Sequence, residues 1–95
     1  MPMKKKQCII DGQAVHTIED FYRELAHQLH FPPHFGNNLD ALWDVLTTDI
    51  KGSIRMVWNC PEASSRDMGE DFERVVSLLQ QVGKERKDFH FTMQE

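Results

Sequence analysis

Asp40 and Asp44 are the residues in this sequence best suited to binding a positively charged partner. They are four positions apart, so in a helix both carboxylates project from one face. Like charges at this spacing destabilise an isolated helix by a few tenths of a kcal/mol. Trp43 lies between them, as either a core residue or an apolar anchor at a protein interface. The group therefore predicts either a solvated acidic helix face or a surface that binds a basic partner.

The charge distribution along the chain bears on the same choice. The chain has 11 Lys and Arg residues against 15 Asp and Glu residues, a formal net charge of −4. No Lys or Arg occurs between Arg23 and Lys51, whereas four acids fall in this interval: Glu24, Asp40, Asp44 and Asp49. This balance disfavours nucleic-acid binding and is compatible with a basic protein partner, with a chance cluster of solvated acids as the alternative.

Neither catalysis nor metal binding is favoured by the sequence. Two acids on one exposed helix face do not form a glycosidase pair, which faces across a cleft. The sequence contains no nucleophile elbow, phosphate-binding loop or dinucleotide fingerprint. Three histidines, His27, His30 and His34, are a weak candidate for a metal site, because Pro32-Pro33 interrupts their spacing. No cofactor is expected.

Length, composition and cysteine content favour a single globular unit. The 95 residues are 40% hydrophobic and 27% charged, so one domain over residues 1–95 is expected. Cys8 and Cys60 fit neither a zinc motif nor a disulfide scaffold, and two reduced cysteines are expected. The basic residues 1–6 precede an apolar run that ends at Asp11, too short for a signal peptide or a membrane span. We therefore expect a cytoplasmic protein that does not bind membranes.

Hydrophobic periodicity predicts the elements of the first half. Residues 7–10 read as a strand that ends at the turn Asp11-Gly12. A helix is predicted to begin after the cap residue Thr17 and to end before Pro32-Pro33, since neither proline can donate a helical hydrogen bond. A second helix is predicted from the cap residue Asn38, with an inward stripe of leucines: Leu39, Leu42 and Leu46.

The second half repeats the alternation of strand and helix. Residues 54–58 and 89–93 read as strands, the latter half-buried. Residues 62–68 are compatible with a loop or a short helix, and apolar residues recur at helical spacing from Phe72 to Val82. Because helices separate the strands, the strands are expected to be parallel. The predicted fold is an α/β domain with a three-stranded parallel sheet and three to four helices.

The segment from Phe31 to Asp44 resembles the signature of the barstar family, intracellular inhibitors of barnase-type ribonucleases. It reads FPPHFGNNLDALWD, and its most specific part begins at Gly36. The resemblance extends over nearly the whole chain, with further matches at Lys5-Lys6, Asp11-Gly12, Leu46-Thr47, Trp58, Glu85 and Asp88. It implies the same fold, a three-stranded parallel sheet with packed helices.

The resemblance also implies a function. In the family, the second helix and the loop before it enter the nuclease active site, where an acid corresponding to Asp44 replaces a substrate phosphate and one corresponding to Asp40 assists. A 1:1 complex with a basic ribonuclease is therefore expected, formed by a free monomer. The residues expected to contact the partner are His34, Gly36, Asn38, Leu39, Asp40, Trp43, Asp44, Thr47, Asp49, Gln81 and Glu85. The alternatives are an immunity or regulatory protein with another basic partner and, third, a small metal-binding protein.

Three of these positions depart from the family pattern. His34 stands where the family has a tyrosine-like aromatic, and Asp49 replaces an exposed aromatic of the prototype. Gln81 occupies the position of an acid on a later helix, although Glu85, one turn further on, matches. The central helix is kept, which implies the same mode of binding with a changed rim.

Overall fold

The computed structural model describes residues 5–95, so the first four residues of the basic N-terminal segment lie outside it. The elements follow in the order strand, two helices, π-helical turn, strand, two helices, strand. Their bounds are β1 Lys6–Asp11, α1 Ile18–Leu29, α2 Leu39–Asp44, η1 Val45–Asp49, β2 Ile54–Asn59, α3 Pro61–Met68, α4 Glu70–Glu85 and β3 Phe89–Gln94.

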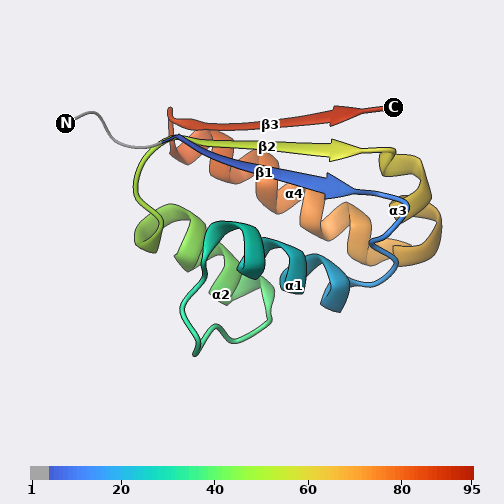
Figure 1. Cartoon of the computed structure of the whole chain (residues 1–95), viewed down its shortest axis with the longest axis horizontal. Coiled ribbons are helices and arrows are strands. Elements are labelled where there is room, and N and C mark those ends of the chain that lie inside the picture. Colours follow the sequence, from blue (N-terminus) through green and yellow to red (C-terminus); the bar gives the residue numbers. More distant parts are fainter. Residues whose placement is uncertain (1–4) are drawn as a thin grey trace.

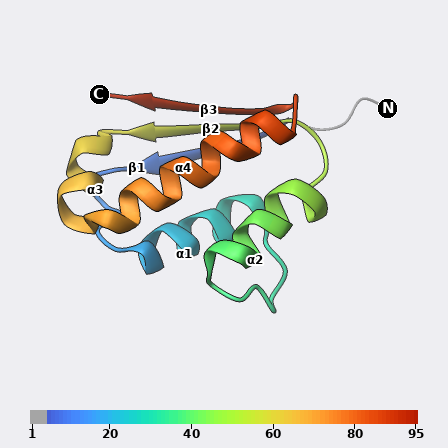
Figure 2. The same ribbon diagram turned by 180° about the vertical axis from the view of Figure 1, so that it is seen from behind.

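The three strands form one parallel sheet in the order β1-β2-β3. The register places Cys8 beside Met56 and Met56 beside Phe91. Helices α1, α2 and α4 lie on one face of this sheet, and α3 lies beyond the carboxyl ends of the strands (Figures 1 and 2). The opposite face carries no helix of residues 5–95. The predicted parallel α/β fold is confirmed.

The core lies between the sheet and the helix layer. In β1 and β2, alternate residues turn inward and are fully buried, as the period of two in a strand requires. Trp58 fills the space beneath β2, stacked on Phe21 with ring centroids 5.2 Å apart and edge-on to Phe72 at 5.1 Å. The terminal strand is half-buried as predicted: Phe89 is buried, while Met93 is 42% exposed on the edge of the sheet.

The predicted helix boundaries agree with the local chemistry of each terminus. Thr17 and Asp20 form a complete capping box at the start of α1. That helix ends at a left-handed residue, His30 with φ 56°, just before the two prolines. The segment 62–68 is a helix rather than a loop, and it begins with Pro61, a residue suited to the first helical turn.

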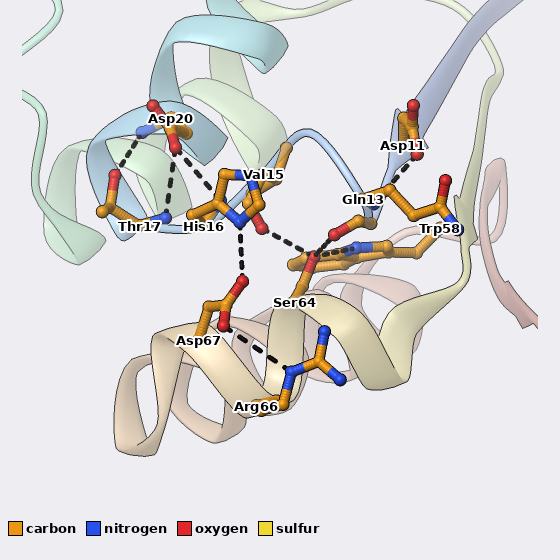
Figure 3. Close-up of polar contacts among 11 residues, drawn as sticks. Asp11, Gln13, Val15, His16, Thr17, Asp20, Trp58, Ser64, Arg66 and Asp67 are labelled. Carbon is orange, nitrogen blue, oxygen red and sulfur yellow. Dashed lines mark hydrogen bonds and ion pairs between the residues drawn. The ribbon is translucent and has the colours of Figure 1, made fainter.

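A buried serine joins α3 to the sheet and to the β1–α1 loop (Figure 3). Ser64 is fully buried; its hydroxyl accepts a hydrogen bond from Trp58 Nε1 at 3.1 Å and donates toward the carbonyls of Gly12 and Val15, at 3.0 and 2.9 Å. A buried indole N–H needs such a partner, because an unpaired one loses its hydration without compensation. This hydroxyl therefore fixes where α3 sits.

A second contact in the same region lies at the surface. His16 Nδ1 is 2.6 Å from Asp67 Oδ2, which links the β1–α1 loop to α3 (Figure 3). This hydrogen bond lowers the pKa of Asp67 below its ordinary value.

None of the helices in residues 5–95 combines the length and the apolar character that crossing a membrane requires.

We expect Ser64→Ala to lower the free energy of unfolding by about 1–3 kcal/mol, because it leaves the Trp58 N–H and two carbonyls unpaired in the core. Urea denaturation at neutral pH measures the change. Ser65→Ala, at the half-exposed neighbouring position, is the matched control and should stay within about 0.5 kcal/mol of the parent. Equal effects of the two substitutions would contradict the assigned role of Ser64.

Candidate functional site

The start of α2 is fixed by the loop that precedes it. Asn38 Oδ1 accepts from the Ala41 N–H at 2.8 Å, and Asn38 Nδ2 donates to the Gly36 carbonyl at 3.1 Å. A Cβ atom at Gly36 would lie 3.1 Å from that Nδ2, closer than side chains normally pack. Gly36 and Asn38 therefore set the angle at which the chain enters α2, whatever contact they make with a partner.

The far end of α2 widens into the π-helical turn η1. Ile50 N–H donates to the Val45 carbonyl at 3.0 Å, five residues back. The Thr47 hydroxyl donates to the Trp43 carbonyl at 2.7 Å and so competes for a helical acceptor. Val45 and Leu46 are buried beneath this turn. Thr47 thus has a role inside its own helix, and its predicted contact with a partner stays a prediction.

Arg86 anchors this end of the helix to the rest of the molecule. Its guanidinium donates to the carbonyls of Leu46 at 2.7 Å, Ile50 at 2.8 Å and Gly52 at 2.7 Å. It also forms a bidentate pair with Asp88, at 2.9 and 3.0 Å. The side chain is only 12% exposed. Carbonyls that end a helix lack internal donors, and here one arginine supplies them.

The same pair determines the protonation of Asp88. The hydrogen bonds from Arg86 lower the pKa of this carboxyl below its ordinary value, against an opposing effect of desolvation. A carboxyl with a lowered folded-state pKa stabilises the fold above the pKa it has in the unfolded chain, about 4. That contribution is lost as the pH falls through the lowered pKa.

The three acids of this segment are exposed and unpaired. Asp40, Asp44 and Asp49 are all exposed at the surface of α2 and η1. Among residues 5–95, no side chain forms an ion pair or hydrogen bond with any of these carboxylates. Their mutual repulsion is therefore not relieved within the described part of the chain. An anchored helix that presents unpaired negative charge is suited to binding a cationic surface.

A shallow groove of about 560 Å³ runs between α2 and α4. It brings together four of the predicted contact residues: Leu39, Asp40, Trp43 and Gln81. Trp43 is half-buried and packs against the edge of the core, and its role as an anchor at a protein interface stays a prediction. His34, Asp44, Asp49 and Glu85 do not line the groove.

Sequence reasoning identified Gln81 on the α4 side of this groove but missed Arg74. Arg74 lines it opposite Asp40 and is held by ion pairs to Glu70 at 3.4 Å and Asp71 at 3.3 Å. The spacing of Glu70 and Arg74, one helical turn apart, was the available signal for an ordered cation on this face. Arg74 places one positive charge beside the acids, so the groove is polar on both walls.

The histidines and cysteines were the other candidates for chemistry. His27, His30 and His34 are exposed, and within residues 5–95 no group of three or more His, Cys, Asp or Glu side chains is arranged to hold a metal ion. Cys8 and Cys60 are both free. Burial raises the pKa of Cys8 to about 12, with a smaller effect from the charge of Glu24, so this thiol is unreactive at neutral pH.

Comparison with known proteins bears directly on the signature helix. A family model described as Barstar (barnase inhibitor) matches residues 5–94. This chain belongs to the barstar family. It is also 35% identical over 83 residues to a protein of Bacillus subtilis (strain 168) named "Putative ribonuclease inhibitor YrdF", covering 87% of this chain and 91% of that relative. The resemblance inferred from Phe31 to Asp44 is confirmed over nearly the whole length of the chain.

In this barstar-family chain we expect Arg86→Lys to lower the free energy of unfolding by about 2–3 kcal/mol. A lysine keeps the charge but cannot supply the planar fork that reaches three carbonyls and Asp88. Urea denaturation gives the loss, and amide exchange should accelerate at Ile50. Arg23→Lys, in an exposed pair with Asp20, is the control and should cost less than about 0.5 kcal/mol. Unchanged stability in Arg86→Lys would show that the anchor is dispensable.

Proposed function

We propose that this barstar-family protein inhibits a basic ribonuclease of the barnase type by covering its active site with α2 and the loop before it. The observation that carries the proposal is a set of three exposed carboxylates, unpaired within the described part of the chain, on a helix held at both ends. A ribonuclease must concentrate positive charge to stabilise the anionic transition state of phosphate transfer. The family description, barnase inhibitor, supports the same partner class.

Rigid presentation of charge is the physical basis of the proposed mechanism. Asp44 takes the position of a substrate phosphate among the cations of the nuclease, and Asp40 adds charge from the previous turn. Because Asn38 and Arg86 already order the helix, little conformational entropy is lost on binding. Trp43 supplies an apolar contact beside the acids.

The remaining proposed contacts surround this centre. They come from the preceding loop, from the first residue of α2, from η1 and from the outer face of α4: His34, Gly36, Asn38, Leu39, Thr47, Asp49, Gln81 and Glu85. The proposed complex has one inhibitor per nuclease, formed by a monomer in the cytoplasm. The free state of Cys8 and Cys60 is compatible with that reducing compartment.

An inhibition assay tests the proposal. A barnase-type ribonuclease is titrated with the protein while cleavage of an RNA substrate is followed, and activity should reach its minimum at one equivalent. Full activity at excess inhibitor, together with capture of a basic protein that is not a nuclease, would favour the immunity or regulatory alternative.

We expect Asp44→Asn to weaken binding to the nuclease more than any other single change in α2, by about 3–5 kcal/mol. The substitution leaves buried cations of the partner without a counter-charge. Glu62→Gln on α3, exposed and outside the proposed contact, removes the same charge and should leave the affinity unchanged. Calorimetric titration measures both affinities. Equal affinities for Asp44→Asn and the parent would exclude Asp44 from the site.

Association should be steered by charge. The acids of α2 and the basic cleft of the nuclease attract one another over long distances before contact, and dissolved salt screens this attraction. The association rate should therefore fall steeply between about 0.01 and 0.15 M ionic strength. The dissociation rate should change much less, since the contacts within the complex are short. Stopped-flow tryptophan fluorescence follows both rates. An association rate indifferent to salt would contradict the steering.

A further inference from the structure

The uncovered face of the sheet carries a second charged surface that the proposed inhibitory site does not use. The register places Gln7, Arg55 and His90 side by side across the three strands. All three residues are exposed, and their strand neighbours on the helix side form the core. Lys5 and Lys6 lie beside this row at the start of β1. A chain with a net charge of −4 thus gathers cations on the face opposite its acidic helix.

A groove of about 530 Å³ lies over this row and draws on all three strands. Most residues that line it carry hydrogen-bond donors: Arg55, His90, Gln7 and Thr92 from the outward rows of the sheet, and Lys5, Lys6 and Ser53 from its end. No Asp or Glu of residues 5–95 lines it. The groove is therefore chemically complementary to an anion.

The positive charge of this groove is not used within the described part of the chain. Of the five arginines, four form ion pairs, namely Arg23, Arg66, Arg74 and Arg86. The guanidinium of Arg55 alone forms no ion pair or side-chain hydrogen bond with any residue from 5 to 95.

Within residues 5–95, no neighbouring group neutralises the positive charge of Arg55. Lys6 Nζ donates to the Lys51 carbonyl at 2.7 Å, which orients the ammonium group without neutralising it. Asp88 is an acid near His90, but Arg86 already binds it through two hydrogen bonds. The Arg55 guanidinium, with Lys5 beside it, is thus available to an external ligand, whereas the Lys6 ammonium is already bound to the Lys51 carbonyl.

The length of this groove and the donors along it indicate the class of ligand that fits it. Adjacent strands are about 4.8 Å apart, so a row across three strands spans about 10 Å, more than one phosphate group covers. The volume lies within the range of small-molecule sites, about 300–1,000 Å³. A guanidinium binds two phosphate oxygens at once, and lysines add point charges. We propose that this groove binds a linear oligophosphate, either free or as the phosphate chain of a nucleotide.

Calorimetric titration of the full chain with sodium tripolyphosphate at low ionic strength tests the proposal. Saturable 1:1 binding is expected, with orthophosphate about tenfold weaker because it reaches fewer cations. Arg55→Gln should weaken tripolyphosphate binding by about tenfold, and His90→Gln should also weaken it. The matched control is Arg66→Gln, which removes the same charge from an exposed position on α3 and should leave binding unchanged. Thermal unfolding establishes that each variant is folded.

Titration with ATP separates the two sources of the phosphate chain. If ATP binds with the same affinity as tripolyphosphate, the phosphate chain alone accounts for binding. If ATP binds more tightly, the groove binds the phosphate chain of a nucleotide. Either result supports the site. Three results would overturn it: no saturable binding of tripolyphosphate, equal weakening by Arg55→Gln and Arg66→Gln, or tighter binding of a single-stranded RNA that lacks terminal phosphates.

Discussion

Arg86 is the residue on which the geometry of the acidic helix depends. It ends α4, and its guanidinium reaches the carbonyls of Leu46, Ile50 and Gly52 at the far end of η1. Asp88 completes the arrangement and balances the charge. One side chain thereby ties the helix that carries the acids to the helix that forms the other wall of the groove. The two walls are expected to keep their relative position when a partner binds.

The molecule separates its charges between its two layers. Within residues 5–95, the helix layer presents Asp40, Asp44 and Asp49 without cationic partners, whereas the uncovered sheet face presents Arg55 without an acidic one. Internal pairing would have stabilised each group only slightly at the surface, by less than about 1 kcal/mol. Leaving them unpaired keeps a strong field on both sides, which favours association with charged ligands.

Local sequence signals predicted most of the fold and the helix that carries the exposed aspartates. The caps at Thr17 and Asn38, the parallel strands and the exposed aspartates of α2 each depend on residues close together in the chain, and the structure agrees. The anchor at Arg86 could not be predicted, because its acceptors lie 34 to 40 positions away. The same holds for the buried hydroxyl of Ser64, whose acceptors come from the β1–α1 loop. Long-range polar contacts of this kind leave no periodic pattern in the sequence.

The most direct test of the inhibitory account is hydrogen–deuterium exchange of the protein alone and in complex with a barnase-type ribonuclease. The account predicts that binding slows amide exchange in residues 34–49 and in the second half of α4, with the β2 and β3 amides unchanged. Protection confined to the sheet or to α3, with exchange in residues 34–49 unaltered, would contradict it.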